Sequence, residues 1–196
     1  LVPTLILGVT LAGRRWGPDV AGWLSAFPIL SGPILLIIAL EQGPDFAAAA
    51  AHGTLLAVLA ILVFSLAYAW AAQRRSWPDC MFIALCLYAL AVLGLRRLDT
   101  SLTVSFVSVI AALLLVPLAF PGVPRWVTGR VTGNDLPWRM GSAAALVLLV
   151  TWGATYLGPR LSGLLAMFPV MSTVLVGFSH RQSGGAFATR LLRGMV

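Results

Sequence analysis

Long runs of apolar residues dominate the chain, and polar residues are confined to the short segments between them. The runs show neither the alternation of a half-buried strand nor the spacing of an amphipathic helix, so each is expected to be apolar on all sides. A helix needs roughly 20 such residues to cross the hydrocarbon core of a bilayer. The pattern therefore predicts an all-α fold, a polytopic transmembrane helical bundle.

The sequence contains about seven runs of suitable length and one shorter stub. We predict transmembrane helices over 1–13, 20–40, 47–72, 80–95, 101–120, 140–157 and 161–179, and a C-terminal stub over 186–196. Among the six runs that follow 1–13, the run 80–95 is the shortest. Because Val196 falls in a run that has barely begun, we expect the sequence to be part of a longer protein.

An internal repeat organises these runs. Residues 17–55 align with 158–196 at a constant offset of 141, so that GPDVAGWLSAFPILS lies over GPRLSGLLAMFPVMS. Eleven of the 39 aligned positions are identical, including the Gly-Pro and Phe-Pro pairs in fixed register. Self-similarity at a fixed period indicates duplication. We predict a first repeat over 1–138, with about five transmembrane helices, and the start of a truncated second repeat over 139–196.

The number of crossings sets the orientation of the two repeats. One period contains five predicted crossings, and five is odd, so the second copy should enter the membrane from the opposite side. This inverted topology is common in secondary transporters. If one of the five segments did not cross, the copies would be parallel instead.

The distribution of charged residues supports the same number of membrane crossings. The chain is 60% hydrophobic and 10% charged, with a net charge of +7 and arginine as its only strongly basic residue type. Under the five-crossing count, ten arginines fall on one side and three on the other. Positive charge marks cytoplasmic loops, so the Arg-rich loops are predicted to be cytoplasmic, near anionic lipid headgroups. A strongly basic chain can also indicate a nucleic-acid-binding protein. Here the arginines flank apolar runs, so we interpret them as residues at the membrane surface instead.

The paired Phe-Pro motifs are the strongest candidates for function. Proline removes a backbone donor and clashes with the carbonyl four residues earlier, so it breaks a helix. At membrane depth the freed carbonyl must find a partner. Two such breaks would frame a substrate site near the midplane; a simple packing kink is the alternative. The candidate substrate-binding residues are Phe27, Pro28, Ser31, Phe168, Pro169, Ser172 and Thr173. The hydroxyl groups of Ser31, Ser172 and Thr173 either line a polar path or bond to their own helix backbone.

Charged residues are expected at the membrane edges. Arg181, Arg190 and Arg193 are predicted to reach lipid headgroups or the interface, or to hold an anionic substrate. His52 and His180 lie near the predicted membrane edges, where solvation is expected. No acidic residue falls deep in a predicted crossing, which disfavours a carboxylate proton relay.

The sequence gives no sign of an enzyme. It contains no nucleophile–base pair and no metal-ligand spacing, and the stretch GRVTGND lacks the Gly-Lys-Ser/Thr of a phosphate-binding loop. We therefore predict no catalytic residues, no metal and no cofactor.

The repeated segment resembles the core of the small GlpM-type bacterial inner-membrane proteins. The likeness runs through Gly163-Leu164, Phe168-Pro169, Gly184 and Arg190, and in the first copy through Gly22, Phe27-Pro28 and Gly43. It covers about 40 residues in each copy. Members of that family are short, single-copy chains of about four helices without an established activity, whereas this chain is duplicated. The resemblance implies a bacterial inner-membrane location and the pairing of inverted halves.

Two functions follow from these observations as hypotheses. The first is a small-solute or lipid-type transporter that rocks one inverted repeat against the other. The second is a non-transporting membrane scaffold, a subunit of an envelope-polymer or lipid-modifying complex. Expected partners are the lipid bilayer, anionic headgroups, a small-molecule substrate and further copies of the chain; nucleic acid is not expected.

Overall fold

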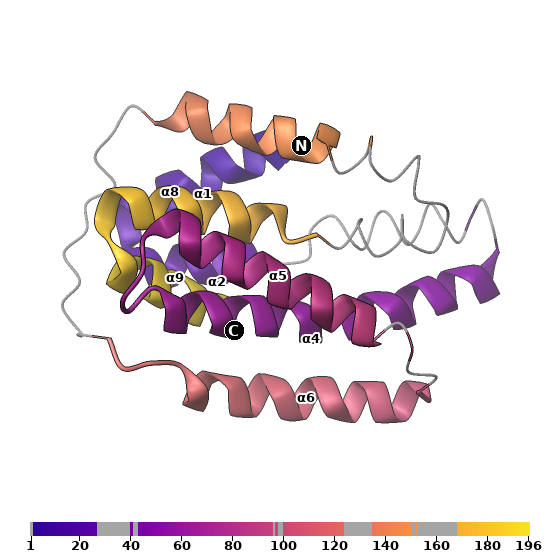
Figure 1. Cartoon of the computed structure of the whole chain (residues 1–196). Helices are drawn as coiled ribbons and strands as arrows, with labels where there is room; N and C mark the ends of the chain where they lie inside the picture. Colours follow the sequence, from indigo (N-terminus) through magenta and orange to yellow (C-terminus); the bar gives the residue numbers. More distant parts are fainter. Residues whose placement is uncertain are drawn as a thin grey trace.

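The regular structure of this chain is helical. The computed structural model describes residues 2–26, 40, 43–95, 97, 100–123, 135–149, 152 and 168–196 (Figure 1). Its helices are α1 (Val2–Trp16), α2 (Pro18–Ala26), α4 (Pro44–Ala71), α5 (Trp77–Leu95), α6 (Leu102–Ala119), the unlabelled helix Leu136–Leu149, α8 (Val170–Ser183) and α9 (Gly185–Met195). The predicted all-α fold is therefore confirmed for the described part of the chain.

Three of the described helices are long and apolar enough to cross a membrane. They cover Ala51–Ala71, Trp77–Leu95 and Leu102–Ala119. The second of them corresponds to the predicted run 80–95 and has 19 residues, so its length suffices for a crossing. The predicted stub is confirmed as a helix of 11 residues, too short to span. Membrane association follows from these helices, whereas the number of passes stays a prediction.

Successive described helices alternate in direction (Figure 1). α4 and α6 run parallel, because His52 contacts Ser105 near their starts and Trp70 contacts Ala119 near their ends. α5 and α8 run antiparallel, because Tyr88 packs on Phe168 while Met81 lies against Gly177.

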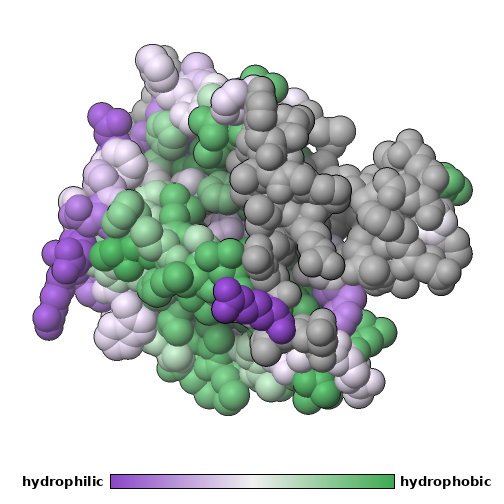
Figure 2. Space-filling view, turned by 45° about the vertical axis from the view of Figure 1, so that its right-hand side comes forward, coloured by the Kyte–Doolittle hydropathy of each residue, from purple (hydrophilic) through white to green (hydrophobic). Residues whose placement is uncertain are grey.

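As a result, most described arginines meet at one end of the bundle. We call this the Arg-rich end; it carries Arg14 and Arg15 in the last turn of α1, Arg74 and Arg75 after α4, Arg139, Arg181 in the last turn of α8, and Arg190 and Arg193 of α9. Figure 2 shows broad hydrophobic surface over the described residues, with much of the hydrophilic surface gathered along one edge. The assignment of these arginines to one side of a membrane, and which side that is, stay predictions.

Two glycines that the repeat aligns adopt the same conformation. Gly43 precedes α4 with φ 89° and ψ 167°, and Gly184 precedes α9 with φ 83° and ψ 171°. The two helices begin at opposite ends of the bundle, because Gly185 lies against Ala72 at the end of α4. The two glycines, 141 residues apart, therefore have the same backbone conformation, and the helices that follow them run in opposite directions. Whether the whole repeat is inverted lies beyond the described residues.

Replacing either glycine should destabilise the protein. At these dihedral angles only glycine is unstrained, so we expect Gly43→Ala and Gly184→Ala each to lower the free energy of unfolding by about 1–3 kcal/mol. Gly8→Ala is the control, since Gly8 lies within α1 and an added methyl group there would have no atom within 4 Å. Thermal unfolding in detergent measures the difference, and a Gly184→Ala protein as stable as Gly8→Ala would contradict the expectation.

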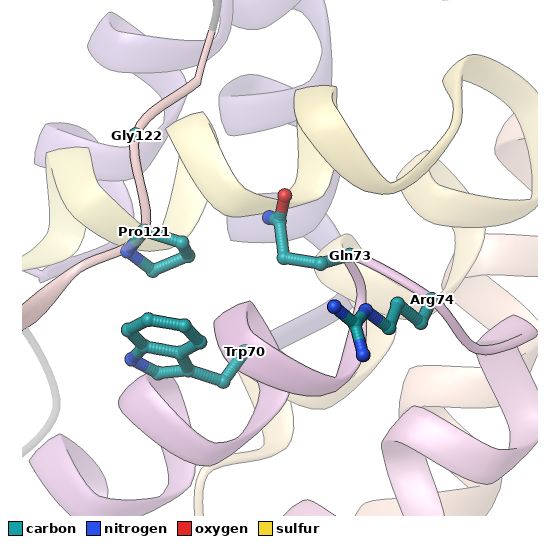
Figure 3. A pocket seen from close by; sticks show the side chains of 5 residues that line it. All are labelled: Trp70, Gln73, Arg74, Pro121 and Gly122. Carbon is teal, nitrogen blue, oxygen red and sulfur yellow. The ribbon is translucent and has the colours of Figure 1, made fainter.

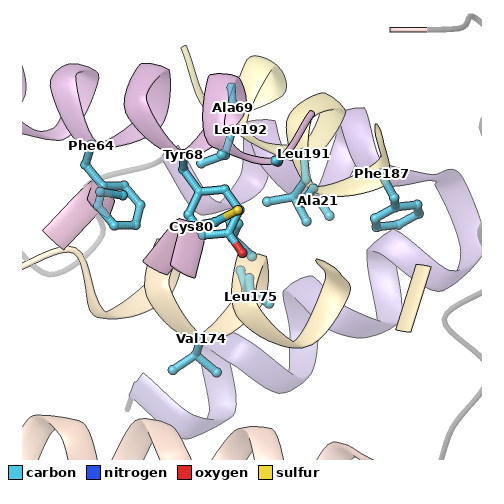
Figure 4. Packing of buried hydrophobic residues seen from close by; sticks show 14 of the residues in the cluster. Ala21, Phe64, Tyr68, Ala69, Cys80, Val174, Leu175, Phe187, Leu191 and Leu192 are labelled. Carbon is cyan, nitrogen blue, oxygen red and sulfur yellow. The ribbon is translucent and has the colours of Figure 1, made fainter. Parts of the chain in front are cut away.

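The buried core joins both halves of the sequence. It contains Phe64, Tyr68 and Ala69 of α4, Cys80 of α5, Val174 and Leu175 of α8, and Phe187, Leu191 and Leu192 of α9 (Figure 4). α9 thus packs among α2, α4 and α8 rather than extending into solvent.

Small residues let α2 approach α9 closely. A methyl group on Gly22 would overlap the Leu191 carbonyl and lie 2.9 Å from Gly194. Small residues at such positions permit close packing of two helices.

Candidate functional site

The chain is not helical at the second Phe-Pro motif. Pro169 has φ −76° and ψ 62°, and the Val170 N–H donates to the Phe168 carbonyl over 2.7 Å. These values define an inverse γ-turn. α8 begins directly after it, at Val170. α8 therefore starts at this motif, whereas the residues directly before Phe168, and Phe27, Pro28 and Ser31 of the first motif, lie outside the described residues, so the break within a helix stays a prediction.

Aromatic packing fixes the position of this turn. Pro169 is buried, and the Phe168 ring meets the Tyr88 ring of α5 edge to face, with centroids 5.9 Å apart and an interplanar angle of 84°. Edge-to-face pairs at this distance are attractive. The turn is therefore held against α5, on the hydrophobic core.

Two hydroxyls follow the turn, and neither bonds to its own helix. The Ser172 hydroxyl donates to the Met195 sulfur of α9 over 3.5 Å, a weak acceptor. The Thr173 hydroxyl is buried without a hydrogen-bond partner, although the Thr173 N–H donates to the Pro169 carbonyl over 2.8 Å. By contrast, the Thr189 hydroxyl does bond to its own helix, at the Gly185 carbonyl. A buried hydroxyl without a partner is unfavourable, so the Thr173 side chain retains free hydrogen-bonding capacity.

A second polar cluster lies at the Arg-rich end and is centred on Arg139. This side chain is only 1% exposed, although the sequence had placed it in a loop. Its Nε donates to Asp135 over 2.5 Å, Nη2 to the Gln182 side chain over 3.2 Å, and Nη1 to Ser179 over 3.5 Å. The guanidinium carbon also lies 5.3 Å from the centre of the Phe178 ring. The loop assignment was wrong because the helix starts at Leu136 and packs its first turn on α8.

Ion pairs extend this cluster to other helices. Asp135 also accepts from Arg14 of α1 over 3.0 Å, so one carboxylate holds two arginines. Arg190 of α9 pairs with Asp19 of α2. Together these pairs connect four helices and the segment before Leu136 at the Arg-rich end.

A small cavity lies beside Arg139. Its volume is about 10 Å³, room for about one water molecule. Its polar lining consists of Thr10, Arg139 and Ser179. The Thr10 hydroxyl is buried and has no hydrogen-bond partner. This cavity is too small for an organic solute.

Both histidines make side-chain contacts that the sequence did not reveal. The Tyr68 hydroxyl lies 3.1 Å from Nδ1 of His180, and Nε2 of His52 lies 2.7 Å from the Ser105 hydroxyl. Both side chains are half-buried, and their solvation at a membrane edge stays a prediction. The partners come from helices 53 and 112 residues away in sequence, which spacing along one helix cannot predict.

The three arginines predicted to meet headgroups differ in environment. Arg181 and Arg193 are exposed, whereas Arg190 is engaged by Asp19. Lipid contact by these residues stays a prediction. Among the described residues no group of three or more potential metal ligands gathers at one place.

Comparisons with protein-family models, curated proteins and solved structures return no match to this chain. The resemblance to GlpM-type proteins therefore stays a prediction carried by the repeated segment alone.

Proposed function

We propose that this chain is an integral membrane protein that transports a small, neutral or weakly polar solute. The observation that carries the proposal is the turn at Phe168-Pro169, followed by the buried Thr173 hydroxyl with no partner. Transporters commonly bind substrate where a helix is interrupted between repeats. A solute hydroxyl or amide that bonded to Thr173 would satisfy this group.

Two further features support an alternating-access mechanism. The aligned starts of α4 and α9 begin at opposite ends of the bundle, as inverted repeats require. The Asp135 and Asp19 ion pairs hold helices together at the Arg-rich end. We assign this end to the closed side of the transporter and, from its charge, to the cytoplasm of a bacterial inner membrane.

Solute flux into proteoliposomes tests the proposal. The probes are a panel of small polyols, amides and neutral amino acids, with protein-free vesicles as the blank. We expect Thr173→Val to lower the flux of the transported solute roughly two- to tenfold, the effect of losing one hydrogen bond worth about 0.5–1.5 kcal/mol. Thr103→Val is the matched control, because Thr103 is exposed on α6.

The possible results distinguish whether the protein transports a solute from whether Thr173 belongs to the binding site. Flux at the level of protein-free vesicles for every probe would reject the transporter. Flux that is present but equal in Thr173→Val and Thr103→Val would reject the site and keep the activity. Pro169→Ala and Pro28→Ala then examine the two motifs in the same assay, with reduced flux expected for each.

A membrane scaffold is the second candidate function. It is favoured by the cavity beside Arg139, which has room for only one water, and by the close backbone packing of α2 on α9. A scaffold should co-purify with one partner in fixed stoichiometry and give no flux above the blank. Measured flux would reject the scaffold as the main function.

A further inference from the structure

An open cavity lies at the Arg-rich end, between the last turn of α4 and the segment after α6 (Figure 3). Its volume is about 680 Å³, and it is lined by Trp70, Gln73, Arg74, Pro121 and Gly122. This size is typical of small-molecule sites. None of these residues belongs to the predicted substrate site.

Trp70 forms a fixed wall of the cavity. Its indole N–H donates to the Ala119 carbonyl over 2.9 Å, which ties the last turn of α4 to the end of α6. The ring is nevertheless 58% exposed, and Figure 3 shows it beside the Pro121 ring. A tryptophan at the end of a membrane helix is typical of the lipid headgroup level.

The opposite side of the cavity is basic. Arg74 is exposed, and no ion pair connects its guanidinium to the rest of the described chain. Arginine presents two parallel donors that match two oxygens of a phosphate group. The carbonyl ends of α4 and α6 disfavour an anion here, so binding should depend on this one guanidinium.

Apolar surface continues from the cavity along α6. Leu114, Leu115 and Leu118 in its last two turns are exposed, with Leu118 at 81%. A bound molecule with an anionic phosphate and long hydrocarbon chains would satisfy both regions at once. Free inorganic phosphate would contact only the basic side of the cavity and would make no contact with Trp70 or Pro121.

We infer that this cavity binds the headgroup of an anionic glycerophospholipid. Arg74 holds the phosphate, Gln73 lies beside it, and Trp70 and Pro121 pack on the glycerol region while the acyl chains follow α6. The inference rests on the membrane placement proposed above but not on transport, so it can hold for a scaffold as well.

Lipid binding to the whole 196-residue chain in detergent tests the inference, with native mass spectrometry as the readout. We expect phosphatidylglycerol to bind more tightly than phosphatidylcholine, and Arg74→Gln to weaken phosphatidylglycerol binding roughly tenfold, as expected for one lost charge-assisted pair. Trp70→Leu should weaken the binding of both lipids. Arg74 is exposed, so its replacement should leave the melting temperature unchanged.

Two controls make the result decisive. Arg181→Gln removes the same charge from an exposed residue at the same end, and it should leave phosphatidylglycerol affinity within about twofold of the unaltered protein. An equal loss in Arg181→Gln and Arg74→Gln would overturn the site, because binding would then reflect the charge of the whole end. Displacement of phosphatidylglycerol by equimolar inorganic phosphate would also overturn it, since the cavity would be a phosphate site.

Discussion

Replacing Arg139 by methionine should lower the free energy of unfolding by about 3 kcal/mol. Removing one partner of a buried ion pair costs roughly 3–5 kcal/mol, because the remaining charge is left without compensation. The lower figure applies because Asp135 keeps its second partner, Arg14, at 3.0 Å. Methionine has a similar length, so the lost interactions rather than a cavity should dominate. Denaturant unfolding in detergent, followed by tryptophan fluorescence, measures the change.

The control and the second variant decide whether the buried pair is responsible. Arg193→Met removes an exposed guanidinium from α9 and should change the free energy of unfolding by no more than about 0.5 kcal/mol. Adding Asp135→Asn to Arg139→Met should lower the free energy of unfolding by no more than about 1 kcal/mol further, because the Asp135–Arg14 pair that it removes is partly exposed. Equal stability of Arg139→Met and Arg193→Met would show that the Arg139 contacts contribute little.

The helices were predictable because each apolar run is continuous. The runs 47–72, 80–95 and 101–120 correspond closely to α4, α5 and α6. In a bilayer a long apolar segment has few alternatives to a helix, since all backbone groups must bond within the segment. Length and hydropathy therefore suffice to predict where such helices lie.

The polar contacts were not predictable from the same pattern. Arg139 lies at the boundary of an apolar run, where the sequence does not distinguish a solvated loop from a packed first turn. Its partners Ser179 and Gln182 come from a helix about 40 residues later. Such pairing depends on which helix faces which. The non-helical backbone at Pro169 is easier to predict, because proline acts on its own backbone.

The repeat raises a related question, since aligned positions need not have the same surroundings. Gly53 and Gly194 occupy equivalent places in the alignment. Gly194 lies at the α2–α9 crossing, where a methyl group would sit 2.6 Å from the Asp19 carbonyl, whereas a methyl group on Gly53 would have no atom within 4 Å. The same residue type is thus required for packing in one copy and not in the other.

We therefore expect Gly22→Ala, on the opposite side of this crossing, to destabilise the protein strongly. Its new methyl group would meet the Leu191 carbonyl, and backbone cannot move aside as a flexible side chain can. The cost of such overpacking is roughly 1–3 kcal/mol, and the upper part of this range should apply. Gly53→Ala should instead stabilise α4 by up to about 1 kcal/mol, because alanine favours a helix. Denaturant unfolding of the two variants should thus give shifts of opposite sign, and a shift of the same sign and size in both would contradict the α2–α9 crossing as the cause.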